Sequence, residues 1–242
     1  MRTLVFGDIH GGYRALKQVM ERAKVTQDDH LIFLGDYVDG WSESDAVIDE
    51  LIRLKAEYKK VTLIRGNHDD LVQQWLEGKT MSPKWLQHGG QSTIDCYEKR
   101  SAQEIKEHIE FYKTFEDYYL DDENRFFCHA GFQNLNGPEY EWHSTAFYWD
   151  RTLWEMACAM REDLKKGDPL YPKRLQLFEE IYIGHTPTTR IHSLVPVNKA
   201  NIWNLDTGAA FKGSLTVMDV VTKEFWQSDP LPVLYPDEQG RN

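Results

Sequence analysis

Five short apolar segments of this sequence each run into a glycine-containing turn that carries an aspartate, an asparagine or a histidine. One such turn is more often ordinary than functional, but five in one chain predict a common site. Oxygen and imidazole donors without thiolate suit Mn, Fe, Zn or Co ions. The turns are Gly7-Asp8-Ile9-His10-Gly11, Gly35-Asp36-Tyr37-Val38-Asp39, Gly66-Asn67-His68-Asp69, His129-Ala130-Gly131 and Gly184-His185-Thr186.

Such a donor set indicates chemistry at phosphorus. A carboxylate shared by two cations can hold them about 3.5–4 Å apart, which is the geometry that clamps the attacking and leaving oxygens of an in-line displacement. A water that bridges two cations also loses a proton more easily, so hydroxide becomes available near neutral pH. Asp36 follows a buried apolar run directly and is the residue around which the other donors are expected to gather.

The segments before these turns must position the donors, and each reads as a short buried strand. Helical spacing of apolar residues after the first two segments gives a β-α-β-α-β order over the first seventy residues, which predicts a parallel sheet with right-handed crossovers. Ligands of open α/β sheets lie at the carboxyl ends of the strands, where these donors would meet. The predicted strands are residues 3–6, 31–34, 61–64, 125–128 and 181–183.

The rest of the chain is expected to complete one α/β domain that spans residues 1–242. Residues 70–117 are predicted to form a helical, cap-like block beside the site, and helical material is expected over about 151–180. Strands predicted at 202–205, 215–220 and 224–226 would form a second, largely antiparallel sheet.

Several residues receive a plain structural interpretation. His30 and His108 are expected at the surface, and Cys128 is expected to be a small buried apolar residue. Trp41 would either pack beneath its loop or form one wall of the pocket.

Composition narrows the class of protein. Lys and Arg number 28 against 39 Asp and Glu, and this net charge of −11 argues against a protein that grips a nucleic acid polymer through its phosphates. Three cysteines make no disulfide framework. No apolar run has membrane-spanning length, and the first strand at Thr3 leaves no room for a signal peptide, so we expect a cytoplasmic protein with no membrane partner.

Taken together, the five turns resemble the motif series of the calcineurin-like metallophosphoesterases. The similarity follows the family order from residue 2 to about 228. More narrowly, it resembles the phosphoprotein phosphatase branch, which includes bacterial and phage Ser/Thr phosphatases and symmetrical dinucleoside-tetraphosphate hydrolases. The resemblance implies a four-layer α/β/β/α sandwich with mixed sheets. It also implies two divalent metal ions, with Mn expected and Fe or Zn as alternatives.

The resemblance further implies a role for each residue of the turns. His68 would donate a proton to the leaving oxygen and Asp39 would orient it, which agrees with the way a carboxylate partner fixes a histidine and favours its charged form. The nucleophile would come from solvent. The implied metal ligands are Asp8 and His10 for the first ion, Asp36 for both ions, and Asn67, His129 and His185 for the second ion.

One departure concerns an arginine that usually follows the aspartate matched by Asp39 and helps to hold the substrate phosphate. This chain has Gly40 there. Arg151 resembles the arginine of a Trp-x-Arg element that supplies a phosphate contact in the bacterial branch. Arg65 and Arg190 adjoin site motifs and could assist, although a salt bridge is slightly favoured for Arg65.

These expectations lead to a metal-dependent phosphoesterase that hydrolyses phosphomonoesters, with Ser/Thr-type protein phosphatase as the main hypothesis. The alternative keeps the metals and changes the substrate to a dinucleoside polyphosphate or another nucleotide. A non-catalytic metal-binding scaffold is the third hypothesis, and it is disfavoured because every expected ligand is present.

Overall fold

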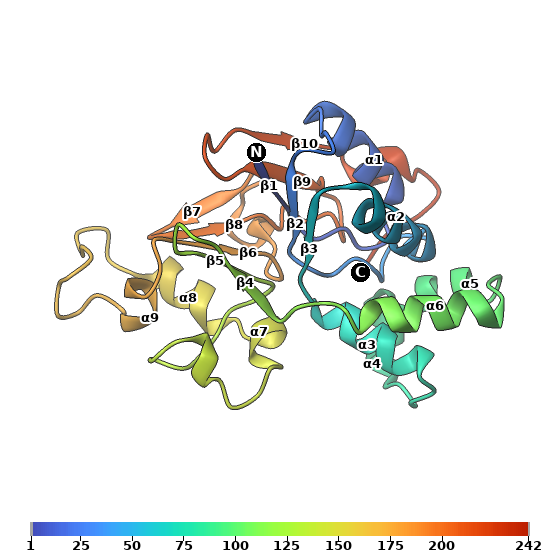
Figure 1. Ribbon diagram of the computed structural model, residues 1–242, viewed down its shortest axis with the longest axis horizontal. Helices are drawn as coiled ribbons and strands as arrows, with labels where there is room; N and C mark the ends of the chain where they lie inside the picture. The colour runs from blue at the N-terminus through green and yellow to red at the C-terminus, as the bar shows by residue number, and fades with distance from the viewer. Residues whose placement is uncertain (1, 242) are drawn as a thin grey trace.

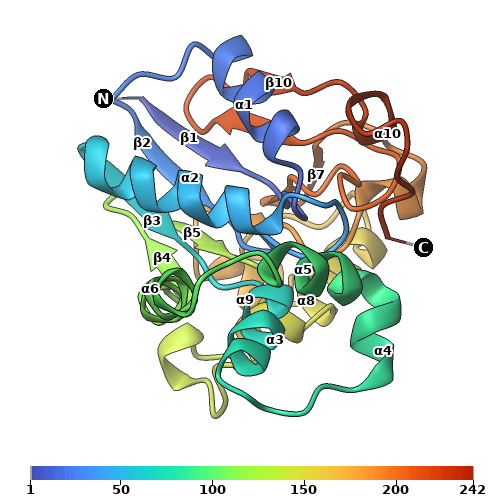
Figure 2. The same cartoon turned by 90° about the vertical axis from the view of Figure 1, so that its right-hand side faces the viewer.

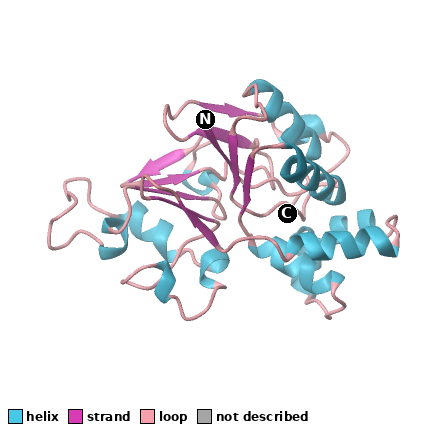
Figure 3. Ribbon diagram, viewed as in Figure 1, coloured by secondary structure: helices cyan, strands magenta, loops and turns pink. Residues whose placement is uncertain are grey.

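Two five-stranded sheets form the centre of the protein in a computed structural model, which describes residues 2–241 (Figure 1). Helices lie outside both sheets, with α1 and α2 beside the first and α7, α8 and α9 beside the second (Figures 1 and 3). The expected fold of the α/β class with two mixed sheets is confirmed.

The first sheet has the strand order β10-β9-β1-β2-β3. The strands β1, β2 and β3 are parallel because the helices α1 (Tyr13–Arg22) and α2 (Ser44–Glu57) carry the chain back between them. The strands are β1 (Thr3–Phe6), β2 (His30–Phe33), β3 (Lys60–Leu63), β9 (Thr216–Asp219) and β10 (Phe225–Gln227).

The second sheet has the order β4-β5-β6-β8-β7, and its central strands β5, β6 and β8 are also parallel. β4 and β7 pair antiparallel at the two edges. The strands are β4 (Tyr118–Leu120), β5 (Arg125–Cys128), β6 (Glu180–Ile183), β7 (Val197–Lys199) and β8 (Ile202–Asn204).

The expectation of a largely antiparallel second sheet is therefore wrong. The last two strands do not join it, since β9 pairs antiparallel with β1 and β10 pairs with β9. β1 is buried from Leu4 to Phe6, and an unpaired edge there would leave backbone groups without partners. The returning chain supplies those partners and so completes the first sheet.

Alternation of side chains along the strands divides the interior into three apolar layers. Leu4 and Phe6 of β1 point toward α1 and α2, whereas Val5 points toward the second sheet. Val5 meets Phe127 and Tyr182 in the layer between the sheets. A third layer packs the second sheet against α8 and α9. The two sheets are thus held face to face, with their strand ends close together.

A block of helices covers one side of the strand ends, and Figure 2 shows it below α2. It packs on the first sheet's helices through contacts between α2 and α5. The block contains α3 (Asn67–Leu76), α4 (Pro83–Trp85), the π-helical turn η1 (Leu86–Gly90), α5 (Gln91–Tyr97) and α6 (Ala102–Tyr112).

The remaining helices are short, and the region 151–180 is more broken than expected. Only α8 and α9 form there, because Gly167, Pro169 and Pro172 interrupt the chain between them. The elements outside the block are α7 (Ala146–Trp149), α8 (Thr152–Ala159), α9 (Lys173–Gln176), α10 (Leu231–Leu234), η2 (Pro138–Tyr140) and η3 (Thr188–Ile191). Across residues 2–241, no helix combines the length and the apolar character needed to cross a bilayer.

Two histidines expected at the surface are buried instead. His30 Nε2 lies 3.0 Å from Thr62 Oγ1 on the neighbouring strand. His108 lies between Tyr97 Oη at 2.7 Å and Asp49 Oδ1 at 3.0 Å, so it joins three helices. Each ring has a partner for its polar nitrogen, which makes burial tolerable.

Cys128 and Trp41 both lie in the interior. Cys128 is buried in the layer beneath the second sheet, as expected. Trp41 packs beneath its loop: its ring stacks on Tyr235 and its Nε1 donates to the carbonyl of Ala209 at 2.7 Å.

Candidate metal centre

Four residues at the strand ends have left-handed backbone conformations. The φ angles are +52° at His10, +54° at Asp36, +67° at Asp39 and +66° at His185. Such angles are uncommon outside glycine, and they cluster at functional sites because the surrounding structure must hold them. Here they lie in the turns that follow β1, β2 and β6, and the ligand atoms of His10 and His185 both lie close to Asp36.

The expected ligands form two groups that share Asp36. Within each group the potential ligand atoms lie within 4.8 Å of one another. His129 Nε2 is 3.3 Å and His10 Nε2 is 3.5 Å from the same Asp36 oxygen. The groups are Asp8, His10 and Asp36, and Asp36, His129 and His185. One carboxylate at the junction of two groups is suited to binding two cations.

Three buried atoms at this point have no hydrogen-bond partner. They are Asn67 Oδ1, His129 Nε2 and His185 Nε2. Buried polar atoms are normally paired, so each of these requires an explanation. The other ring nitrogen of His129 lies 2.8 Å from the Leu34 carbonyl, which places the hydrogen on Nδ1 and the lone pair on Nε2. These residues fit a divalent cation, which would be the missing partner.

The pKa shifts of two of the three histidines agree with this assignment, whereas at His129 burial is outweighed by the charge of Asp36, which raises the pKa to about 9, so a cation bound there would displace a proton. Burial lowers the pKa of His10 to about 3 and lowers the pKa of His185 well below its usual value, so both rings are neutral, as metal ligands must be. Burial and the neighbouring Asp206 raise the pKa of Asp8 well above its usual value. A bound cation would stabilise the charged form of this carboxylate, which is buried and lies near other acidic groups.

Two glycines are needed for the close approach of the turns. A Cβ at Gly184 would lie 2.0 Å from Asp8 Oδ1, and a Cβ at Gly66 would lie 2.2 Å from the backbone nitrogen of Asp36. Any side chain at either position would displace a candidate ligand.

Asp39 and His68 form a buried pair beside the candidate ligands. His68 Nδ1 lies 2.6 Å from Asp39 Oδ2, and the carboxylate of Asp39 is fully buried. Two residues of the helical block complete its hydrogen bonding, since Trp85 Nε1 donates to Oδ2 at 2.6 Å and Thr93 Oγ1 donates to Oδ1 at 2.6 Å. The pair is therefore fixed in orientation, with the His68 ring at the wall of the pocket.

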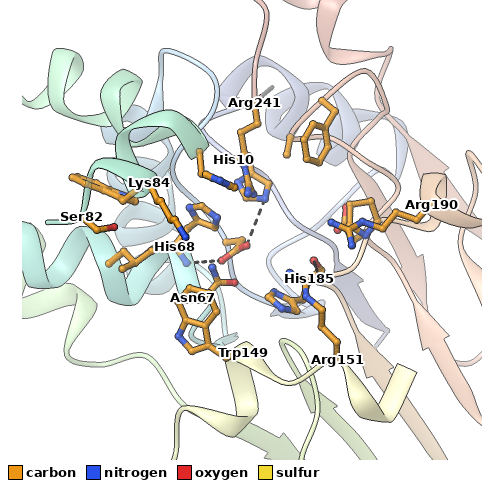
Figure 4. Close-up of a pocket in the computed structure, with 18 residues that line it drawn as sticks. His10, Asn67, His68, Ser82, Lys84, Trp149, Arg151, His185, Arg190 and Arg241 are labelled. Carbon is orange, nitrogen blue, oxygen red and sulfur yellow. Dashed lines mark hydrogen bonds and ion pairs between the residues drawn. The ribbon is translucent and has the colours of Figure 1, made fainter. Parts of the chain in front are cut away.

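A pocket of about 360 Å³ opens above the candidate ligands (Figure 4). Arg151 lines it and donates from Nη1 to Thr186 Oγ1 at 2.8 Å. Besides the ligands and His68, the wall carries four cationic side chains and three aromatic rings. These are Lys84, Arg151, Arg190 and Arg241, and Trp85, Trp149 and Phe211.

Arg65 does not line this pocket. Its guanidinium donates to Gln73 Oε1 at 2.6 Å and to the carbonyl of Tyr112 at 2.9 Å, and so joins α3 to α6. Within residues 2–241 these two neutral acceptors take the place of the salt bridge that was slightly favoured, and a phosphate contact by Arg65 stays a prediction.

Sequence reasoning did not assign a role to several residues that shape the site. Asp69 accepts hydrogen bonds from the backbone nitrogens of Asp36, Tyr37 and Gly66 at 2.8 to 2.9 Å, so it holds two of the turns together. Asp206 lines the pocket just after β8. The sequence carries a signal for both residues, because each is an aspartate in a glycine-containing turn that follows a strand.

The calcineurin-like phosphoesterase family model matches residues 1–203. Two curated relatives are named bis(5'-nucleosyl)-tetraphosphatase PrpE [asymmetrical]. The protein of Bacillus mycoides (strain KBAB4) is 26% identical over 235 residues, which cover 89% of each chain. The protein of Geobacillus thermodenitrificans (strain NG80-2) is 27% identical over 237 residues, which cover 90% of each chain.

Solved structures show the same fold. A protein serine/threonine phosphatase from Saccharomyces cerevisiae aligns with a TM-score of 0.60 at 14% identity, covering 95% of this chain and 80% of that one. A metallophosphoesterase from Sphaerobacter thermophilus aligns with a TM-score of 0.54 at 14% identity, covering 95% of this chain and 89% of that one.

Proposed function

This chain belongs to the calcineurin-like phosphoesterase family, and on that premise we propose that it hydrolyses nucleoside polyphosphates, with dinucleoside tetraphosphates as the leading substrates. The curated relatives named as asymmetrical tetraphosphatases, over about nine-tenths of both chains, support this substrate class. They favour the nucleotide alternative over the Ser/Thr protein phosphatase that the motifs suggest first.

The chemistry of the pocket wall carries the proposal. Four cationic side chains face the candidate ligands, which is more than a single phosphate group needs and is suited to a chain of phosphates. Aromatic rings can stack on a nucleobase, and the half-exposed Trp149 is available for such a contact. A phosphorylated side chain of a protein would leave most of these groups unused.

A second hollow offers room for the second nucleoside of such a substrate. It shares Trp149 and Arg151 with the first pocket, so the two hollows are adjacent. Trp142, whose side chain is 88% exposed, lines this hollow and could stack on the second base.

In the proposed reaction, Asp8, His10, Asp36, Asn67, His129 and His185 would hold two divalent cations, with Mn expected. When bound, such ions polarise phosphate oxygens and increase the acidity of water. Arg151 would bind a phosphate through its free guanidinium edge. His68, held by Asp39, would give a proton to the oxygen of the leaving group, which makes cleavage of a poor leaving group easier.

A panel assay tests the proposal. Manganese-loaded protein is given diadenosine tetraphosphate, ATP, a phosphoserine peptide and p-nitrophenyl phosphate, and the products are separated by chromatography. We expect the highest kcat/KM for diadenosine tetraphosphate, with ATP and AMP as products, because the relatives are named as asymmetrical enzymes. A phosphopeptide turned over faster than every nucleotide would overturn the proposal in favour of a protein phosphatase. Absence of any hydrolysis would favour the scaffold.

A further inference from the structure

We propose that Arg241 is a substrate-binding residue that holds a phosphate of the polyphosphate chain next to the one attacked. The inference rests on the proposed function and names a contact within it. Arg241 lies 201 positions after Gly40 (241 − 40), yet its side chain lies over this glycine at the wall of the pocket.

Three contacts fix the segment 228–241 in place. The ring of Tyr235 stacks on Trp41 with centroids 5.2 Å apart. Glu238 accepts hydrogen bonds from the backbone nitrogen of Ser42 at 3.0 Å and from its hydroxyl at 2.7 Å. The backbone nitrogen of Arg241 donates to the carbonyl of Ala210 at 2.8 Å. The arginine is therefore held at the pocket by these contacts with residues 41–42 and 210.

The stem of Arg241 lies where two glycines leave space. A Cβ built on Gly40 would be 3.4 Å from Arg241 Cγ, and a Cβ built on Gly89 would be 3.0 Å from the same atom. Gly89 belongs to the π-helical turn η1 of the helical block, so the arginine lies between that block and the turn after β2. Side chains at these two positions would take the space that the stem occupies.

The guanidinium of Arg241 has no acceptor within residues 2–241. Its Nε is buried without a hydrogen-bond partner, and no carboxylate of the described chain forms an ion pair with it. Its Cζ lies 5.5 Å from the centre of the Phe211 ring, a contact that leaves the planar edge free. A buried donor without a partner is costly, and phosphate oxygens match the fork of a guanidinium. The unmet donors thus point to an anionic ligand.

The position of Arg241 relative to the other arginines indicates which anion. Figure 4 shows Arg241 beside His10, whereas Arg151 lies beside His185 on the other side of the candidate ligands. Two arginines on opposite sides of the reacting centre can each hold a phosphate that flanks the attacked one. A monoester has no flanking phosphate, so this arrangement selects for a polyphosphate.

The test replaces Arg241 by methionine, which keeps an apolar stem over the glycines and removes the charge. Loss of a charge-assisted contact predicts a fall of roughly 10- to 100-fold in kcat/KM for diadenosine tetraphosphate, mostly through KM. The fall for p-nitrophenyl phosphate should be smaller, so the ratio of the two kcat/KM values drops at least about fivefold. Arg241→Lys should recover part of the loss. Arg161→Met is the matched control, because Arg161 is exposed and pairs with Asp163 away from the pocket.

Inhibition by inorganic tripolyphosphate separates this inference from the proposed function. The readout is inhibition of p-nitrophenyl phosphate hydrolysis, which does not require a nucleotide substrate. Weaker inhibition in Arg241→Met, with metal content and melting temperature unchanged, would support the contact even if the wild type cleaved no dinucleotide. Unchanged inhibition, or an equal loss with both substrates, would overturn it.

Discussion

Two neighbouring regions of the site differ in the hydrogen bonding of their buried polar side chains. At the first, which contains Asp39 and His68, both oxygens of Asp39 accept hydrogen bonds from the helical block as well as from His68. At the second, which contains His129 and His185, the Nε2 atoms are buried without partners. Both regions are almost inaccessible to solvent, so exposure does not explain the difference.

The comparison shows how a fold separates two tasks. The proposed proton donor, His68, is held by Asp39, and the Asp39 carboxylate is itself held by Trp85 and Thr93, so that the orientation of His68 is fixed before substrate binds. A group that must bind an ion keeps its lone pair unused, and only its far nitrogen is held, as His129 Nδ1 is by Leu34. The buried Nε2 atoms without partners are energetically unfavourable until a cation binds them.

The largest expected effect comes from removing the carboxylate that both ligand groups share. Asp36→Asn keeps a residue type that accepts the left-handed backbone but removes the charge. Because each cation contributes several kcal/mol to transition-state stabilisation, activity should fall by roughly 10⁴-fold or more. Loss of bound metal, measured by mass spectrometry of the desalted protein, should accompany it. The exposed His192→Asn serves as the control and should retain both.

Next in size is the effect of removing the proposed proton donor. His68→Asn should lower kcat by roughly 10²–10⁴-fold for substrates with poor leaving groups, the usual contribution of general acid catalysis. Metal content should stay at the wild-type value, which distinguishes this region from the other. Equal losses for p-nitrophenyl phosphate and phenyl phosphate would contradict the assignment, because p-nitrophenolate is the better leaving group and needs less proton transfer.

Removing the metal tests the region that contains His129 and His185, and the stability of the protein is the quantity measured. At a metal concentration 100-fold above the dissociation constant, binding adds about 2.7 kcal/mol to the free energy of unfolding. For a chain of this size we expect chelation to lower the melting temperature by about 5–10 °C. His129→Ala should remove most of this difference between metal-loaded and chelated protein. A melting temperature that is insensitive to chelation would mean that no ion binds there.

The smallest expected effect concerns the fully bonded region. Thr93→Val removes the hydroxyl that donates to Asp39 Oδ1 and keeps the shape of the side chain. A buried carboxylate oxygen then lacks one donor, which should lower the free energy of unfolding by about 1–3 kcal/mol with or without metal. Urea denaturation of both forms measures this. If Thr93→Val lowered the free energy of unfolding only in the metal-loaded form, the two regions would not differ in their dependence on metal.

Local pattern explains what the sequence predicted well. A strand followed at once by a glycine and a donor can be recognised within ten residues, and this pattern located the residues of both ligand groups. Asp39 and His68 lie in the same turns, and their pairing is implied by the family resemblance. Asp206 lies in a comparable turn after β8, Leu205-Asp206-Thr207-Gly208, so the same pattern extends to it.

Long-range packing explains what the sequence did not predict. Trp85 and Thr93 reach Asp39 because the helical block folds back over the turn after β2, and neither residue type marks that contact. His108 looks like a polar helical residue until Tyr97 and Asp49 meet it. The antiparallel return of β9 to β1 likewise depends on which sheet edge is left open when the chain arrives.

The left-handed conformations at His10, Asp36, Asp39 and His185 have a consequence for anyone who wishes to engineer this protein. Each holds about 1–3 kcal/mol of unfavourable backbone energy that a glycine would release. Selection for heat resistance alone would therefore favour substitutions at these four positions. Each such substitution would remove a side chain of the candidate site. Thermal robustness and turnover oppose each other at these positions, so a stabilising screen on this scaffold should leave them fixed.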